Sequence, residues 1–222
     1  VIAASLLLAA AFALPQGPLA VRGATVYTMA GAPIENGVVL VVDGKIAAIG
    51  AAADVAVPDG ARVLEAEVVT PGLIDAHATV GLTGMLNVPH DQDQLEKSAP
   101  VQPELRAIDA FHARDGLVAW LRGFGITTVH TGHGPGALVS GQTMVVKTHG
   151  RSADQDVVAP LCMVAVTLGD EGRAADGKSP GTRAKSIAML REELQKAREY
   201  AAKRQRDADA PVVDAAVASL SG

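Results

Sequence analysis

The stretch that decides the fold is Val69-Thr70-Pro71-Gly72-Leu73-Ile74-Asp75-Ala76-His77-Ala78-Thr79-Val80. A Pro-Gly pair, which marks a turn, stands before a short apolar run that ends in polar side chains. Such a run is typical of a strand in the interior of a sheet. Because side chains alternate along a strand, His77 and Thr79 are expected to leave the strand on the same side.

Downstream of this stretch, apolar strands alternate with helices or long loops. The pattern predicts a helix around 117–121 and a long amphipathic helix over about 182–206. Strands separated in this way indicate a parallel α/β sheet. The further strands are predicted at 126–131, 143–147 and 161–168.

Upstream of position 71, the chain has short strands joined by turns. The pair Asp43-Gly44 lies between two of them and is the strongest short-range signal for a hairpin. Residues 20–70 are therefore predicted to form a small antiparallel β unit, separate from residues 71–222. The strands of this unit are expected at 21–28, 38–42, 45–49 and within 62–70.

The first 14 residues are apolar except for Ser5. The run is too short to span a bilayer and has the length of a signal-peptide core, and Ala11-Phe12-Ala13 follows as an A-x-A-like cleavage site. Residues 1–19 are interpreted as a signal peptide with a truncated start and a short linker. The alternative is a buried helix of the mature fold. The signal peptide predicts an exported protein, periplasmic or extracellular, with no stable membrane span.

Composition limits the partners. The net charge is −5 and no Lys/Arg run could follow a phosphate backbone, so nucleic acid is not expected to bind. A small-molecule substrate is expected instead. The only cysteine, Cys162, cannot form an internal disulfide. It lies in an apolar run and is expected to be a buried structural residue rather than a catalytic thiol.

The stretch 69–80 resembles the first-strand signature of the amidohydrolase superfamily, Pro-Gly-x-Ile-Asp-x-His-x-His. The segments 103–109, 125–129 and 141–148, and Thr182-Arg183 before the long helix, are similar to the imidazolonepropionase-like branch. The resemblance covers about residues 20–206. It implies a TIM-type (β/α) barrel preceded by a composite β-sandwich. A full barrel takes about 250 residues, and about 150 follow position 70. The fold class is therefore α/β with a partial barrel.

The resemblance also implies a metal site at the mouth of the barrel, where two imidazoles hold a divalent metal, with zinc expected from the family pattern. His77 matches the first ligand, whereas Thr79 stands where the second histidine is expected. The family's later ligands would lie beyond Gly222. Metal is thus expected in a full-length protein but not in this fragment. His130 and His133 are either replacement ligands or substrate contacts, or polar loop residues bonded to the backbone.

Two functions follow from the resemblance. The first is an exported, metal-dependent amidohydrolase acting on non-peptide or cyclic C–N bonds, of which this chain is an N-terminal fragment that is inactive alone. The second is a catalytically silent relative that serves as a binding or pairing subunit in a homo- or hetero-oligomer. The replacement at Thr79 favours the second function directly.

The cleavage site generates a prediction. Residues 1–13 are expected to be absent from the mature protein, because signal peptidase cuts after small residues in the A-x-A arrangement. Mass spectrometry of the exported protein measures this. A mature chain that still carries Val1 contradicts the interpretation.

Overall fold

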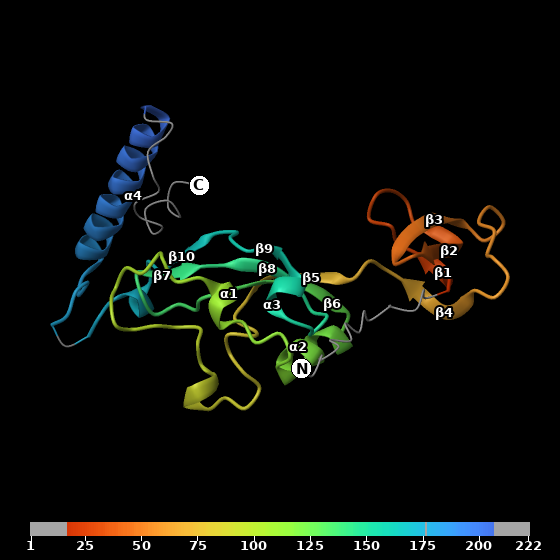
Figure 1. Ribbon diagram of the computed structural model, residues 1–222, viewed down its shortest axis with the longest axis horizontal. Coiled ribbons are helices and arrows are strands. Elements are labelled where there is room, and N and C mark those ends of the chain that lie inside the picture. Colours follow the sequence, from red (N-terminus) through yellow and green to blue (C-terminus); the bar gives the residue numbers. More distant parts are fainter. Residues whose placement is uncertain (1–16, 176, 207–222) are drawn as a thin grey trace, which may run out of the picture. The chain divides into compact units, whose positions relative to one another are not determined.

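The computed structural model describes residues 17–175 and 177–206. It divides the chain into two compact units, Val1–Pro71 and Gly72–Gly222 (Figure 1). The expected signal peptide lies almost entirely outside the described residues. Within the described residues, no helix combines the length and the apolar character that crossing a membrane requires.

The first unit contains one four-stranded sheet with the order β3-β2-β1-β4. Strands β1, β2 and β3 form an antiparallel meander, and the turn between β2 and β3 is the predicted Asp43-Gly44, with both residues at positive φ. The strands are β1 (Leu19–Val26), β2 (Ile34–Val42), β3 (Lys45–Ala51) and β4 (Arg62–Val69).

The prediction of a purely antiparallel unit is wrong at β4, which pairs with β1 in parallel. The connection 52–61 returns the chain to the far edge of the sheet, so β4 runs in the same direction as β1. Ala20, Val38 and Leu40 form the buried centre of the unit. In its described part the unit has a single sheet, whereas a sandwich requires two.

The second unit is built on a sheet with the order β5-β6-β8-β9. Strands β5 and β6 are parallel, as predicted, but β8 is antiparallel to β6 and β9 is antiparallel to β8. The sheet is therefore mixed, and no closed barrel is present in the described residues. The strands are β5 (Leu73–Ala78), β6 (Ile126–Thr131), β8 (Met144–Lys147) and β9 (Val157–Ala159).

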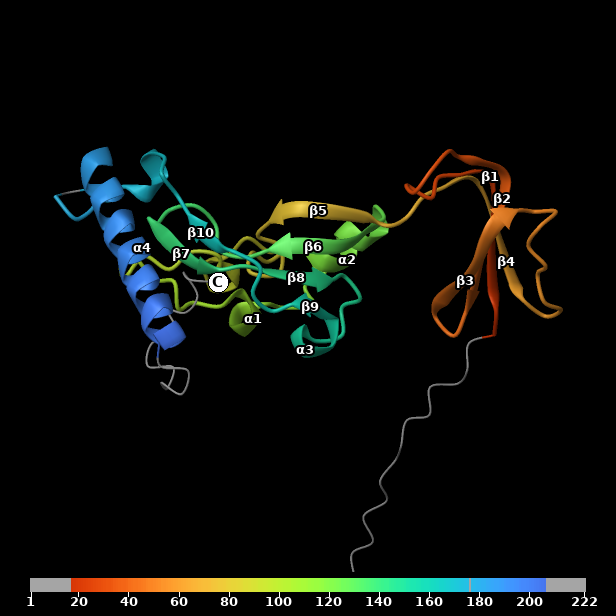
Figure 2. The same cartoon turned by 90° about the horizontal axis from the view of Figure 1, so that it is seen from above.

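The direction of β8 has a physical reason. A parallel return needs a crossover of a dozen or more residues, usually a helix. The 12 residues between Thr131 and Met144 hold no helix, and part of them forms β7 (Val139–Gln142). Strand β7 pairs with β10 (Val164–Val166) in a separate antiparallel ribbon (Figure 2). The predicted fourth strand, 161–168, is thus reduced to three residues outside the main sheet.

Few helices accompany the sheets. The described residues form two short 3-10 turns, η1 (Pro89–Asp91) and η2 (Asp170–Gly172). The α-helices are α1 (Ala107–Ala110), α2 (Gly116–Gly123), α3 (Ala153–Asp156) and the long helix α4 (Arg183–Arg206). Helix α4 confirms the prediction over 182–206, and the Thr182 hydroxyl accepts the Lys185 N–H at its start.

The core of the second unit joins α2 to the sheet. Val118 and Leu121 of α2 belong to one buried cluster with Val129 of β6 and with Met144 and Val146 of β8. Burying such side chains contributes about 1.5–3 kcal/mol each. This packing fixes the strands whose ends carry the predicted site residues.

A buried carboxylate organises the loop after β8. Asp156 is fully buried and accepts hydrogen bonds from the Arg151 backbone N–H at 2.9 Å and from Arg151 Nε at 3.2 Å. His149 Nδ1 lies 3.3 Å from the same carboxylate. Burial alone would raise the pKa of Asp156, but these hydrogen bonds and the Arg151 charge outweigh it and lower the pKa.

Replacing Asp156 with Ala is expected to lower the free energy of unfolding at pH 7 by about 2–4 kcal/mol, because Arg151 and the loop lose a buried acceptor. Since the folded pKa is below the unfolded value, this stabilisation is present above about pH 4 and is lost as the pH falls through the folded pKa. Urea unfolding of Asp156→Ala tests this, with the exposed Asp154→Ala as control. Equal losses in the two variants contradict the role.

Candidate functional site

The parallel pair β5 and β6 brings the predicted site residues to one edge of the sheet. Ala78 of β5 is the register partner of Thr131 of β6, and the Gly132 N–H donates to the Ala78 carbonyl at 3.2 Å. The Thr131 hydroxyl donates to the Val80 carbonyl at 2.8 Å. In open α/β sheets and barrels, ligand sites form at this carboxyl edge of the strands.

Strand β5 is irregular where it carries His77. Its pairing with β6 shifts register between Asp75 and Ala78, so three steps along β5 match two steps along β6. The His77 N–H donates to Asp75 Oδ1 at 3.1 Å, and the His77 side chain is exposed. Because a bulge breaks the alternation of side chains, the expectation that His77 and Thr79 leave the strand on the same side no longer follows from the strand period.

Thr79 lies beyond the end of β5 and begins a turn. Its carbonyl accepts the N–H groups of Leu82 at 3.1 Å and Thr83 at 2.8 Å. Its hydroxyl accepts a hydrogen bond from the Thr83 hydroxyl at 3.1 Å. The residue at the expected second ligand position is therefore part of a local hydrogen-bonded turn.

His130 joins three segments. Its Nδ1 lies 2.9 Å from the Ala76 carbonyl of β5, and its Nε2 lies 2.6 Å from the Thr143 hydroxyl next to β8. A carbonyl can only accept, so Nδ1 carries the proton, and a neutral ring then accepts from Thr143 at Nε2. Thr143 Oγ1 also accepts the Met163 N–H at 3.1 Å. With both nitrogens engaged, the ring has no lone pair for a metal. The interpretation of His130 as a hydrogen-bonded structural residue fits this geometry.

His133 has a different environment. Its residue is 6% exposed, and neither ring nitrogen has a hydrogen-bond partner in the described structure. The ring packs on Gly141, where an added Cβ would lie 2.5 Å from His133 Cδ2. Burial lowers the pKa of His133, and the nearby Leu105 carbonyl opposes this shift only in part. His133 is therefore a buried neutral imidazole, separated from the exposed His77.

The described residues do not fit a bound metal ion. They contain no group of three or more His, Cys, Asp or Glu side chains that could hold one. His130 and Thr79 are engaged in hydrogen bonds, which leaves His77 as the one accessible imidazole at this edge. A catalytic metal needs about three protein ligands.

Three further residues in this unit bear on the site, and one of them settles a prediction. Cys162 is exposed, so the prediction of a buried cysteine is wrong, although its backbone N–H donates to the Thr143 carbonyl at 2.8 Å. Lys147 Nζ donates to the Thr128 hydroxyl at 2.8 Å, which is a structural contact between neighbouring strands. Sequence reasoning missed Gln94, whose Oε1 is buried without a partner and whose carbonyl accepts the Gly134 N–H at 2.6 Å. No local pattern marks a single glutamine in a polar loop.

No protein-family model and no curated protein sequence matches this chain. Among solved structures, an amidohydrolase from Thermotoga maritima MSB8 matches with a TM-score of 0.78 and 22% sequence identity. The match covers 91% of this chain and 54% of that chain. Over the matched residues, the fold of this chain is similar to that of the Thermotoga amidohydrolase. This chain spans about half the length of the solved amidohydrolase.

Two further solved structures match only locally. Ochratoxinase from A. niger shares 21% identity over 35% of this chain and 21% of its own, with a TM-score of 0.29. N-acetyl-D-glucosamine-6-phosphate deacetylase from Mycobacterium smegmatis shares 21% identity over 52% of this chain and 32% of its own, with a TM-score of 0.28. These scores are too low to inform the site.

The buried imidazole of His133 predicts a pH dependence of stability. Its folded pKa is below the unfolded value of about 6.5, so the unfolded chain binds the proton more readily. The free energy of unfolding should therefore fall as the pH drops below about 6.5. In His133→Leu this fall should be smaller than in the native chain, and in the exposed His90→Leu it should be unchanged. Urea unfolding at pH 7 and pH 5 measures it. An equal fall in the native chain and His133→Leu contradicts the assignment.

Proposed function

We propose that this chain is the N-terminal part of an exported hydrolase that cleaves C–N bonds other than peptide bonds and belongs to the imidazolonepropionase-like branch. The observation that carries the proposal is the amidohydrolase fold over 91% of the chain, with the Pro-Gly-x-Ile-Asp-x-His motif on β5. In such a reaction water adds to the amide carbonyl carbon and the C–N bond breaks. A linear amide is released as an acid and an amine, whereas a cyclic amide opens to one product that carries both groups.

The edge of the sheet supports the proposal of a fragment. Strand β5 is the terminal strand of its sheet in the described structure, and its Leu73 and Ile74 are 57% and 70% exposed. Folded proteins rarely leave a long apolar edge strand uncovered, since it would pair with other chains. In the proposed full-length protein, further strands pair with β5 and close the barrel.

The proposed divalent metal, zinc, belongs to that full-length protein. Because the described residues offer one accessible imidazole, the remaining ligands have to come from outside them. The chain by itself is therefore proposed to bind no metal stoichiometrically and to be inactive. Its contribution to the site is His77, which Asp75 positions through the His77 backbone N–H.

A second function is favoured by the hydrogen bonds at Thr79 and His130. If the missing ligands are also replaced in the full-length protein, the chain is a catalytically silent subunit that binds or pairs. In that case the polar groups at the ends of β5 and β6 only stabilise the loops.

Thr79→His tests the proposed function. In the 222-residue chain the variant should remain without stoichiometric zinc, because one added imidazole still gives fewer than three ligands. In the full-length protein with its downstream ligands, the variant should raise zinc content and the rate at which cyclic amides are opened by hydrolysis. The measurements are the metal content, by mass spectrometry, and the turnover rate. His77→Ala is the matched control, since it removes the one proposed ligand of this chain.

The outcomes separate the two functions. A native full-length protein that holds zinc, and loses it in His77→Ala, supports the hydrolase. A full-length protein without zinc in the native, Thr79→His and His77→Ala forms supports the silent subunit. A native 222-residue chain that purifies with stoichiometric zinc shows that the account of the site is wrong.

A further inference from the structure

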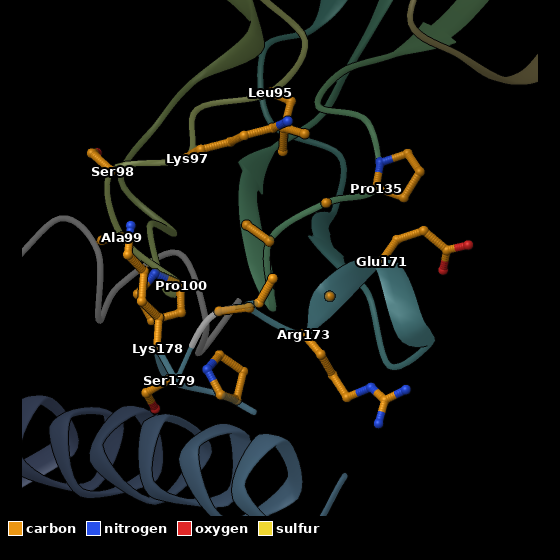
Figure 3. A pocket seen from close by; sticks show the side chains of 16 residues that line it. Leu95, Lys97, Ser98, Ala99, Pro100, Pro135, Glu171, Arg173, Lys178 and Ser179 are labelled. Atoms are coloured by element: carbon orange, nitrogen blue, oxygen red, sulfur yellow. The ribbon is translucent and has the colours of Figure 1, made fainter. Parts of the chain in front are cut away.

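A cleft of about 780 Å³ lies in the second unit, beside the loop that follows β6. Its volume falls within the range of small-molecule sites, about 300–1,000 Å³. Three parts of the chain form its walls, namely 95–100 before α1, 135–137 between β6 and β7, and, before α4, residues 171–175 with 178–180. Figure 3 shows Lys97 and Lys178 on one side of the cleft, with Glu171 and Arg173 on the other.

Close backbone packing shapes these walls. Gly136 has φ 140°, and a Cβ added there would lie 2.2 Å from Leu95 Cδ2, so the loop 135–137 can approach Leu95 only with glycine. Gly172 is buried, and a Cβ there would lie 2.2 Å from the Thr167 carbonyl oxygen. The Ala174 N–H donates to the Pro180 carbonyl at 2.8 Å, which closes the third segment on itself. The cleft is therefore formed by the fold before any ligand binds.

The charge of the lining differs from that of the chain. Three cationic side chains, Lys97, Lys178 and Arg173, line the cleft with one carboxylate, Glu171, whereas the whole chain carries −5. Neither lysine makes an ion pair with another described residue, although Arg106, Arg151 and Lys196 do. Unpaired cations beside low-dielectric walls concentrate a positive potential.

Arg173 lies on the side of the cleft opposite the two lysines (Figure 3). Its terminal nitrogen is paired with Asp170, and its Nε is buried without a partner in the described structure. The free positive charge of the lining is therefore that of Lys97 and Lys178. Pro100, Pro135 and Leu95 supply apolar surface in the same cleft.

We propose that this cleft binds a small organic acid, with its carboxylate near Lys97 and Lys178 and its compact apolar body against the proline-lined wall. This binding goes beyond the proposed hydrolysis, because all of its residues lie in this chain. The chain is expected to bind such acids even when it is inactive and free of metal.

The test is a titration of the native 222-residue chain with N-acetyl-L-proline, followed by NMR, with N-acetyl-L-prolinamide as the uncharged analogue. The acid should bind about tenfold more tightly than the amide, and added salt should reduce this difference. The double variant Lys97→Gln/Lys178→Gln should lose about tenfold in affinity for the acid, with little change for the amide.

The control is Lys185→Gln together with Lys45→Gln, which removes two exposed positive charges elsewhere and should leave the affinity unchanged. Equal binding of acid and amide by the native chain overturns the proposal, and so does an equal loss in the two double variants. Full competition by inorganic phosphate at equal concentration also overturns it, since it would show an unspecific anion site. Because this assay needs no metal and no turnover, its result is independent of the zinc measurements that test the proposed function.

Discussion

The second unit depends on one imidazole, that of His130, which links β5 to the start of β8. The ring contacts the Ala76 carbonyl on one side and the Thr143 hydroxyl on the other, and Thr143 in turn accepts the Met163 N–H. These contacts bring together segments that are up to 87 positions apart, and the Thr143 hydroxyl acts both as a donor and as an acceptor. A half-buried network of this kind specifies one arrangement because an unpaired member would be costly. The ends of β5 and β6, and hence the candidate site, take their positions from it.

Local signals predicted the local structure well. The Asp43-Gly44 turn, strands β5 and β6 and helix α4 all follow from short patterns that are complete in the sequence. The direction of β8 does not, since it depends on whether the preceding connection packs as a crossover, and nothing within 143–147 records that. The parallel pairing of β4 with β1 was not predicted, for the same reason. Strand existence is a local property, whereas strand direction and partner are tertiary properties.

The candidate site shows the same division. The sequence identified His77, Thr79, His130 and His133, but their roles depend on neighbours that it does not place. The alternation of side chains along β5 predicts that His77 and Thr79 point to the same side of the strand. The bulge, which can be seen only in the pairing of β5 with β6, removes the basis for that prediction. His130 and His133 are three positions apart, yet one is satisfied at both nitrogens and the other at neither. That difference comes from Thr143, 13 positions after His130, and from Gly141, eight positions after His133.

Structural and chemical roles compete for the same lone pairs. An imidazole that accepts from Thr143 cannot ligate a metal, and a hydroxyl that accepts from Thr83 is held in its turn. The polar groups at the ends of β5 and β6 are therefore occupied by hydrogen bonds within the fold. Lys97 and Lys178, in contrast, form no ion pair with another described residue. Loop 132–138 connects the two regions, since it starts at the end of β6 and forms a wall of the cleft. A ligand held in the cleft would therefore lie against the loop that carries His133. Recognition of a ligand by this chain thus needs no change at His130, but metal chemistry at this edge would require the His130 bridge to break or ligands to come from elsewhere.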